Sequence, residues 1–265
     1  MKLNRIIVVR AFLILLIFPL FSCDPISNNY NNEPKGPGAI VLTFDDKYIS
    51  DWFTADSIFS IYDWKATFCV TKYETLTDIE KQKLKELQNK GHEIASHGSK
   101  HIRATEYLSN HTMDDYTNDE ILPSLKSMEG DGLNISSFTY PYGFRSIETD
   151  LTLFDYFSVL RGTTWKYSTM SSQKCFVNKG SGKMIVYSLG IDNHYEYFNI
   201  DFFLNLLKYA HQEGLALILY GHKIAADDTS KYVTSYNTLN EICNYAQQSG
   251  MEFLTLRELV NFNLN

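Results

Sequence analysis

Residues 39–46 read AIVLTFDD, a short and mostly apolar run that ends in two aspartates. A run of this length and composition predicts a buried strand over residues 39–44. Strands and helices then alternate along the chain. Further strands are expected at residues 65–71, 92–96, 137–140, 157–160, 183–189, 215–220 and 252–256, and helices at 77–90, 114–128, 200–212 and 239–248. The alternation favours a mostly parallel α/β sheet, and about seven or eight such repeats are enough to close a barrel.

The composition is that of a packed globular protein. Of the 265 residues, 44% are hydrophobic and 21% are charged, which excludes a disordered or fibrous chain. The net charge is -7, and acidic chains without a basic patch are not typical of nucleic-acid binding. No obligate protein partner is evident. Cys69 and Cys243 lie in patterns typical of buried thiols, so no disulfide framework is expected.

The N-terminus has the features of an export signal. Lys2, Arg5 and Arg10 precede an apolar stretch at residues 11–21 that is too short to span a bilayer as a stable helix. A signal peptide is therefore predicted over residues 1–22. Cys23 follows directly, as in the lipobox of bacterial lipoproteins, where the cysteine becomes the lipidated first residue; a plain cleaved signal is the alternative.

A polar segment separates this N-terminus from the strands. Residues 23–38 are rich in Asn, Pro and Gly, as is typical of a tether, and residues 39–265 form the predicted domain. Cleavage before Cys23 removes three basic residues, which leaves 24 − 3 = 21 basic against 31 acidic residues and a net charge of 21 − 31 = -10. The expected mature protein is an exported lipoprotein of the bacterial cell envelope, held at the membrane by its N-terminal lipid.

Ionisable side chains follow the ends of several predicted strands. Asp45 and Asp46 end the first strand, His97 and His101 follow the third, and His222 follows the strand at 215–220. The carboxyl ends of parallel strands meet at one rim of a barrel, where active sites gather. These five groups are therefore expected to converge, provided that the chain bends at the two aspartates, since neighbouring residues on a straight strand face opposite ways.

One carboxylate and two imidazoles are the ligand set of an open metal site for hydrolysis. Asp46, His97 and His101 are the predicted ligands of a divalent metal, with zinc expected and cobalt or nickel as alternatives. Asp45 is then free to act as general base toward water, and His222 as general acid toward the leaving group. Backbone N–H groups of the PYG turn at 141–143 would help to stabilise an oxyanion.

Four motifs resemble those of the NodB-homology polysaccharide deacetylases, or carbohydrate esterase family 4. They are TFDD at 43–46, SHGSKH at 96–101, YPYG at 140–143 and LILYGH at 217–222. The resemblance covers residues 40–259 and implies a deformed (β/α) barrel that removes acetyl groups from sugar polymers, most often from N-acetylglucosamine units, with a divalent metal. It implies the roles given above and assigns Tyr142 to the oxyanion through its backbone N–H.

The chain departs from this family pattern at two places. Many members carry an arginine two residues before the proline of the third motif, where this chain has Thr139. Arg161, in the sequence RGTTW, is the candidate that replaces it in orienting Asp45. No clear counterpart of the family's fourth motif, which contains an aspartate and a tryptophan, is found.

The remaining candidates have ordinary alternatives. No role is assigned to His92, His111, His194 and His211. Candidates for stacking on sugar rings, with core packing as the alternative, are Trp52, Tyr142, Trp165 and Tyr167. Two other functions stay open: a glycan-binding lipoprotein without catalysis, and a hydrolase of the same fold acting on a small amide or a formylated sugar lipid. Acetyl esters are also open as substrates.

The lipidation of Cys23 can be tested by substitution. The wild-type protein should partition into detergent, and Cys23→Ser should release it into the aqueous phase or block its processing, because the thiol carries the lipid. Phase partitioning and the mass of the mature N-terminus measure both. A processed Cys23→Ser protein that still partitions into detergent would exclude lipidation at this residue.

Overall fold

The structure is a computed structural model that describes residues 36–226 and 230–263. The predicted signal peptide, Cys23 and residues 23–35 of the predicted tether lie outside the described residues. No helix within the described ranges is long and apolar enough to cross a membrane.

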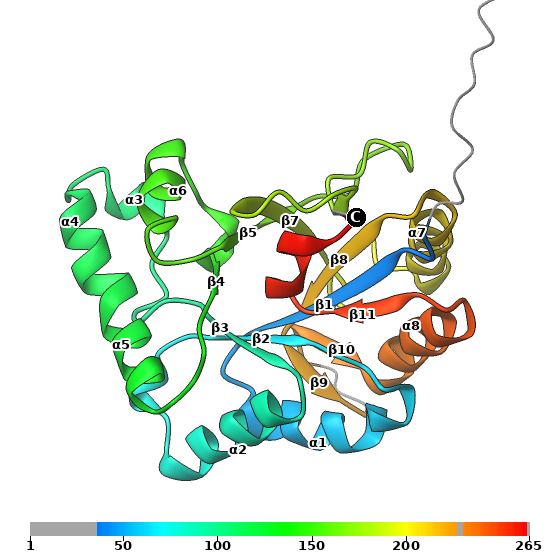
Figure 1. Ribbon diagram of the computed structural model, residues 1–265, viewed down its shortest axis with the longest axis horizontal. Coiled ribbons are helices and arrows are strands. Elements are labelled where there is room, and N and C mark those ends of the chain that lie inside the picture. Colours follow the sequence, from blue (N-terminus) through cyan, green and yellow to red (C-terminus); the bar gives the residue numbers. More distant parts are fainter. Residues whose placement is uncertain (1–35, 227–229, 264–265) are drawn as a thin grey trace, which may run out of the picture. The chain divides into compact units, whose positions relative to one another are not determined.

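Seven parallel strands close into a barrel, which confirms the predicted fold class (Figure 1). In order around the ring they are β1 (Ala39–Asp46), β2 (Thr67–Val70), β3 (Glu93–Ser96), β4 (Ser137–Thr139), β5 (Val159–Thr164), β7 (Met184–Gly190) and β8 (Ala216–Gly221). The ring closes where β8 pairs with β1, with Ala39 opposite Ala216 and Phe44 opposite Gly221.

The barrel is deformed because two of its strands, β1 and β8, each pair with a short extra strand along part of one edge. β11 (Glu252–Leu254) pairs with the first residues of β1, and β2 takes over the same edge from Thr43 onward. β6 (Phe176–Val177) runs antiparallel to the start of β8, before β7 joins it. The strand predicted at 252–256 is therefore a partial neighbour of β1. A separate two-stranded sheet contains β9 (Lys223–Ala225) and β10 (Val233–Ser235).

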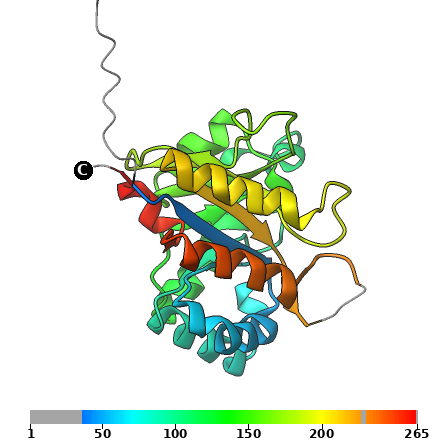
Figure 2. The ribbon, with the colours of Figure 1, turned by 90° about the vertical axis from the view of Figure 1, so that its right-hand side faces the viewer.

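Helices surround the ring. The longer ones are α1 (Ile49–Phe59), α2 (Asp78–Asn89), α5 (Leu122–Gly130), α7 (Ile200–Glu213) and α8 (Tyr236–Gln248); α3 (Ala104–Tyr107), α4 (Met113–Tyr116) and α6 (Ile147–Leu153) are short. Single turns are η1 (Ser60–Tyr62), η2 (Tyr73–Thr75), η4 (Pro141–Gly143) and η5 (Arg257–Asn261). Figure 2 shows α7 and α8 side by side, with α7 against β1 and β8 and α8 against β10 and β11.

The helix predicted at 114–128 is interrupted. Between α4 and α5 the chain forms a π-helical segment, η3 (Thr117–Ile121). Pro123 follows at the start of α5, and a proline there cannot donate to the carbonyl four residues back and its ring collides with it. The wider π turn accommodates this conflict, and such turns recur at functional sites.

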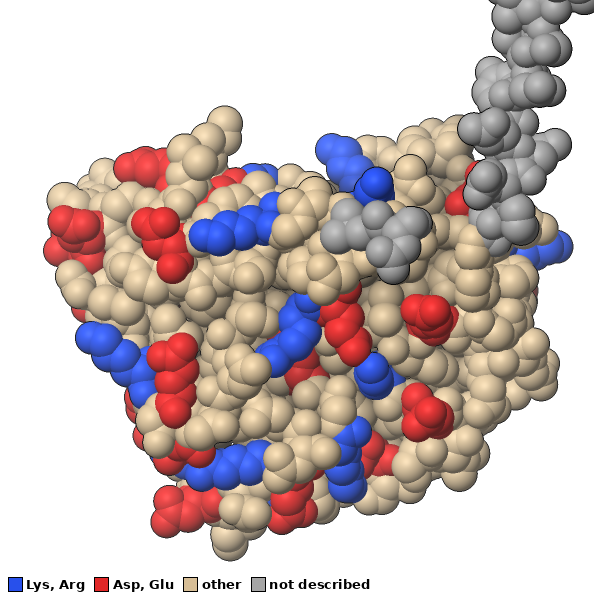
Figure 3. All heavy atoms as spheres, viewed as in Figure 1, with Lys and Arg blue, Asp and Glu red and all other residues tan. Residues whose placement is uncertain are grey.

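The strands divide their side chains between two apolar layers. Ile40, Leu42 and Phe44 of β1 face outward into the large core under the helices. Ala39 and Val41 face into the barrel, where they pack with a cluster from the C-terminal segment around η5: Leu256, Leu259 and Phe262. This apolar cluster fills the N-terminal end of the barrel, so the inward polar side chains gather toward the other end. Acidic and basic side chains are interspersed on the face that Figure 3 shows.

A buried charged cluster connects α1 to the start of β3. The ring of His92 is buried, and its Nδ1 accepts a hydrogen bond from the Ala66 N–H, so Nε2 donates to Asp56 Oδ1 at 2.8 Å. Lys90 Nζ lies 2.7 Å from the other oxygen of Asp56. Burial raises the pKa of Asp56, but these donors outweigh it and lower the pKa to about 2. His92, to which the sequence assigned no role, is thus a core histidine with both ring nitrogens bonded.

Asp56→Asn should lower the free energy of unfolding at neutral pH and flatten its fall between about pH 4 and pH 2. The carboxyl pKa is 3.8 when unperturbed and about 2 in the fold. Its ionised form therefore stabilises the folded chain above the unfolded value, and this contribution, about 2 kcal/mol, is lost as pH falls through the folded value. Urea unfolding at stepped pH measures it.

Asp155, which is exposed, provides the matched control, and Asp155→Asn should leave both the stability and its pH profile unchanged. An Asp56→Asn profile that runs parallel to wild type down to pH 2 would contradict the assignment.

Candidate active site

The ionisable residues predicted to converge do meet, at the C-terminal ends of β1, β3 and β8. Asp45, Asp46, His97, His101 and His222 all line one cavity of about 980 Å³. The bend required at the two aspartates is present, because Asp46 has a φ of 82°. This left-handed conformation, uncommon for a residue other than glycine, turns both carboxylates toward the cavity.

Asp46, His97 and His101 form the one group of three such donors, among the described residues, that lies close enough to hold a metal ion. His101 Nε2 lies 3.2 Å from His97 Nε2 and 3.4 Å from Asp46 Oδ1. Burial lowers the pKa of His97, and burial together with His97 lowers that of His101 to about 4. Both rings are therefore neutral at pH 7 and offer lone pairs, which fits the chemistry of a divalent metal site.

Thr139 fixes the orientation of the His97 ring. His97 Nδ1 lies 2.8 Å from the Thr139 carbonyl oxygen and 2.7 Å from its Oγ1. Because a carbonyl only accepts, Nδ1 carries the proton and Nε2 is left to face the other two donors. The residue that stands in the position of the family's arginine therefore contacts a predicted metal ligand.

Arg161, from β5, lies against Asp45. Its Nη2 donates to both carboxylate oxygens of Asp45, at 2.5 and 2.6 Å, and its Nη1 donates to Ser188 at 3.1 Å. Both Asp45 and Arg161 are buried. Burial raises the pKa of Asp45, but the charge of Arg161, with His97 and His222, brings it below its ordinary value. Asp45 is thus held ionised in the cavity floor, with Arg161 in the place expected for the missing arginine.

Asp192 is a functional candidate that the sequence analysis missed. Its Oδ2 lies 2.5 Å from His222 Nδ1, and its Oδ1 accepts hydrogen bonds from Thr234 and from the His222 backbone. Burial lowers the pKa of His222, but the hydrogen bond and charge of Asp192 raise it above its ordinary value. Asp192 comes two residues after β7, so the strand-end rule applied to the other residues would have found it.

Tyr142 lies beside the predicted metal ligands. It belongs to η4, directly after β4, and has a left-handed φ of 59°. Its ring centroid is 4.6 Å from that of His101, and half of its side chain is exposed to the cavity. The turn therefore brings its backbone to the rim at which the resemblance places an oxyanion contact.

The four candidates for sugar stacking differ. Trp165 is 74% exposed and, like Tyr142, lines the cavity, whereas Tyr167 is partly exposed outside its lining. For Trp52 the alternative that the sequence left open, core packing, holds. This tryptophan is fully buried, stacks on Phe68, and donates from Nε1 to the His222 carbonyl at 2.7 Å. Packing under α1 therefore makes it a support for His222.

The histidines without an assigned role lie in different surroundings. His111 is exposed, whereas His211 is half-buried with its Nδ1 2.9 Å from the Pro37 carbonyl oxygen, and neither lines the cavity. His194, by contrast, lines the cavity and contacts Tyr195 and Tyr232, a position that its sequence context did not indicate. Cys69, Cys175 and Cys243 are buried free thiols, in agreement with the absence of a predicted disulfide framework.

Comparisons with known proteins agree with this geometry. Residues 32–153 match the family described as polysaccharide deacetylase. No curated protein sequence matches the chain significantly.

Several solved structures share the fold. The CE4 domain of a multidomain xylanase from the hindgut metagenome of Trinervitermes trinervoides is 18% identical, with a TM-score of 0.54 over 84% of this chain and 90% of that one. The peptidoglycan deacetylase PdaC of Bacillus subtilis is 18% identical, with a TM-score of 0.52 over the same shares. A CE4 esterase of Streptococcus mutans is 13% identical, with a TM-score of 0.54 over 83% and 87%.

The candidate metal site predicts that the three histidines of HEIASHGSKH, residues 92–101, differ in whether they bind metal. His97→Ala, His101→Ala and Asp46→Ala should each lose bound divalent metal, because two protein donors remain where three are needed. His92→Ala should keep it, since His92 bonds to Asp56 at the other end of β3. Elemental analysis of metal per chain, after equilibration with zinc and desalting, measures the difference. Full metal in both His97→Ala and His101→Ala would refute the ligand set.

Proposed function

We propose, from the match of residues 32–153 to the polysaccharide deacetylase family, that this chain is a metal-dependent deacetylase of an acetylated glycan. N-acetylglucosamine units are the expected substrate. The observation that carries the proposal is the arrangement of two ionisable groups around the Asp46, His97 and His101 cluster. Asp45 has a lowered pKa and His222 a raised one, as a base and an acid working in one site require.

Asp45 serves as the general base in this proposal. Its carboxylate is ionised at neutral pH and accepts a proton from the water that attacks the acetyl carbonyl carbon. The 2.5 and 2.6 Å bonds from Arg161 keep both oxygens oriented toward the cavity. They also moderate the basicity of Asp45, because the guanidinium stabilises the ionised form.

His222 serves as the general acid. The bond from its Nδ1 to Asp192 Oδ2 leaves Nε2 as the nitrogen that donates a proton to the departing amine. Asp192 favours the imidazolium, so a useful fraction of His222 is protonated at neutral pH. The carbonyl of His222 is held in turn by the Trp52 N–H, which fixes the ring relative to the cavity.

Asp46, His97 and His101 would hold the metal. When bound there, a divalent ion supplies Lewis-acid activation of water and of the acetyl carbonyl. The Tyr142 N–H is the proposed protein contact for the developing oxyanion. Zinc suits two imidazoles and one carboxylate, and cobalt or nickel would take the same donors.

The surroundings of the cavity favour a sugar polymer over a small amide. Four exposed aromatic side chains line it: Tyr142, Phe144, Trp165 and Tyr232. Flat apolar surfaces at an open mouth suit the faces of successive sugar rings, whereas a small substrate favours an enclosed pocket. The buried Asp45–Arg161 and His222–Asp192 pairs argue against a glycan-binding protein without catalysis, because binding requires neither a base nor an acid.

The location that we propose is the bacterial cell envelope, with the chain anchored by a lipid on Cys23.

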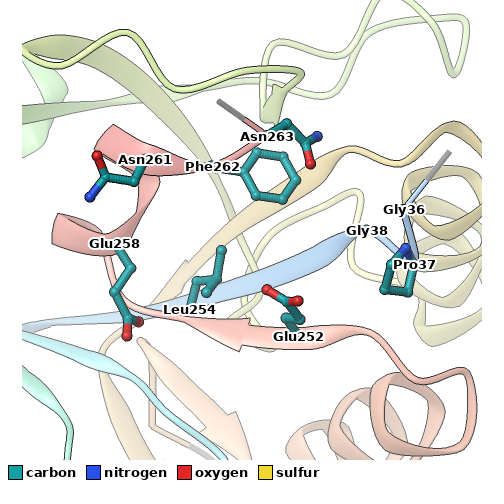
Figure 4. Close-up of a pocket in the computed structure, with 9 residues that line it drawn as sticks. All are labelled: Gly36, Pro37, Gly38, Glu252, Leu254, Glu258, Asn261, Phe262 and Asn263. Carbon is teal, nitrogen blue, oxygen red and sulfur yellow. The ribbon is translucent and has the colours of Figure 1, made fainter. Parts of the chain in front are cut away.

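The first described residues pack against the C-terminal part of the chain. Gly36, Pro37 and Gly38 line a small pocket of about 290 Å³ with residues of β11 and η5 (Figure 4). Only glycine suits position 38, where φ is 71° and a Cβ would lie 2.7 Å from the Ala210 carbonyl oxygen. The chain thus enters the domain at the start of β1, the end opposite the proposed active site.

Asp45→Asn and His222→Ala should each reduce the turnover of an acetylated glycan by about a hundredfold or more, with metal content near wild type. The measurement is acetate release from acetylated chito-oligosaccharides, with other acetylated glycans in parallel and a chelator-treated sample for comparison. Loss of metal in Asp45→Asn would mean that the roles of the two aspartates are exchanged. Wild-type protein that releases no acetate from any glycan would contradict the proposed function.

A further inference from the structure

The loop that carries His101 is held by a buried carboxylate outside the cavity. Glu120 lies in the π-helical segment η3 and is fully buried. Its Oε2 accepts a hydrogen bond from the Lys100 N–H at 2.7 Å, and its Oε1 accepts one from the Ile102 N–H at 2.8 Å. The two residues on either side of His101 are therefore bonded to two different oxygens of one side chain.

The loop fits closely around this carboxylate. A Cβ at Gly98, where φ is 82°, would lie only 2.0 Å from Glu120 Oε1, so only glycine lets the backbone approach so near. The Glu120 carbonyl accepts a further bond from the Ser99 N–H at 2.8 Å. On the other side, the Gly98 carbonyl accepts bonds from Thr71 Oγ1 and the Lys72 N–H. Residues 98–102 are thus clamped between η3 and the end of β2.

His101 itself needs such a clamp. Its φ of 64° is left-handed, a conformation that costs free energy for a residue with a Cβ and persists only where the surroundings enforce it. That conformation directs the imidazole to within 3.2 Å of His97 Nε2 and 3.4 Å of Asp46 Oδ1. A straighter loop would move the ring away from the other two donors.

We propose that Glu120 is the positioning residue of the metal site: by binding the N–H groups on both sides of His101, it preorganises this ligand for the ion. The inference rests on the proposed metal site but assigns a role that the motifs do not include. Glu120 does not contact substrate, and it acts only through the loop. Residues that orient metal ligands typically change metal affinity by about 10- to 100-fold when they are substituted.

Glutamine is the informative substitution because it keeps the length and volume of Glu120 but has one acceptor oxygen. Its NH2 group would face one of the two backbone N–H donors, so Lys100 and Ile102 cannot both be satisfied. Glu120→Gln should therefore raise the dissociation constant for zinc by about tenfold or more. Turnover at saturating zinc should recover toward wild type, because Asp45 and His222 are untouched.

Asp119 provides the matched control on the same segment. It binds the side chain of Lys100, at 3.0 Å from Nζ, and contacts the Tyr107 hydroxyl, without a bond to the loop backbone. Asp119→Asn should leave the zinc dissociation constant at the wild-type value. Competition with a chromophoric chelator measures this constant. We choose pH 8 for the measurement because it lies above the pKa of Glu120. Burial raises that pKa to about 7, although hydrogen bonds from Ile102, Lys100 and His101 lower it.

A readout without metal keeps the proposal testable if Glu120→Gln folds poorly. In the metal-free wild-type protein, the amide protons of Lys100 and Ile102 should be protected from hydrogen exchange, and Glu120→Asp, whose shorter side chain cannot reach both, should expose at least one. Unprotected amides in folded wild-type protein would overturn the inference. An unchanged zinc dissociation constant in folded Glu120→Gln would also overturn it, whereas wild-type protein that binds no metal would instead refute the proposed function.

Discussion

The pairing of β8 with β1 is the constraint on which the rest of the structure depends. It joins the strand at residues 216–221 to the strand at residues 39–46 along six consecutive residue pairs and so turns an open sheet into a ring. Without closure, the end of β8 would be a distant sheet edge. With closure, His222 and Asp45 line the same cavity, so that the group with the raised pKa and the group with the lowered pKa face one site.

Closure also determines how charges are buried. The apolar cluster around η5 fills one end of the barrel, and the polar groups are confined to the other. There Asp45 is paired with Arg161, and His222 with Asp192. A buried charge without a partner is strongly destabilising, whereas a well-bonded pair approximately offsets its desolvation. The two pairs therefore permit an ionised base and a protonated acid to exist at the buried floor of the cavity.

A second feature of the site is that several of its residues have an unfavourable backbone conformation, which contacts with neighbouring segments maintain. Asp46, His101 and Tyr142 all adopt left-handed conformations at the rim. Each directly follows or lies near a strand end, where the ladder no longer dictates φ. The Glu120 carboxylate holds the loop of His101, and the Thr139 carbonyl separately orients the neighbouring ring of His97. The site is thus preorganised by contacts among segments far apart in the chain.

Much of the fold and of the candidate site could be predicted from the sequence alone, because both depend on patterns within short segments of the chain. The apolar runs of 39–44 and 215–220 and the amphipathic segments of α2, α7 and α8 carry their own periodicity, so the alternating pattern and the barrel class followed from them. Aspartates and histidines directly after strands predicted which side chains would share a rim. The family resemblance followed from the same residues, and residues 32–153 match the polysaccharide deacetylase family.

Other features were decided only by tertiary structure. The helix predicted at 114–128 is interrupted at η3, just before Pro123. Glu120 of η3 affects the site only because it binds the backbone of a loop about 20 residues earlier in the chain. For Trp52 the sequence left stacking on sugar and core packing both open, because a tryptophan looks the same in sequence whether it faces a sugar or the backbone of His222; only the fold shows that it is buried. Asp192 acquires its partner, His222, through a side-chain contact 30 residues away in sequence. Local pattern reports how a segment folds, but pairing of buried charges depends on which segments the closed barrel brings together.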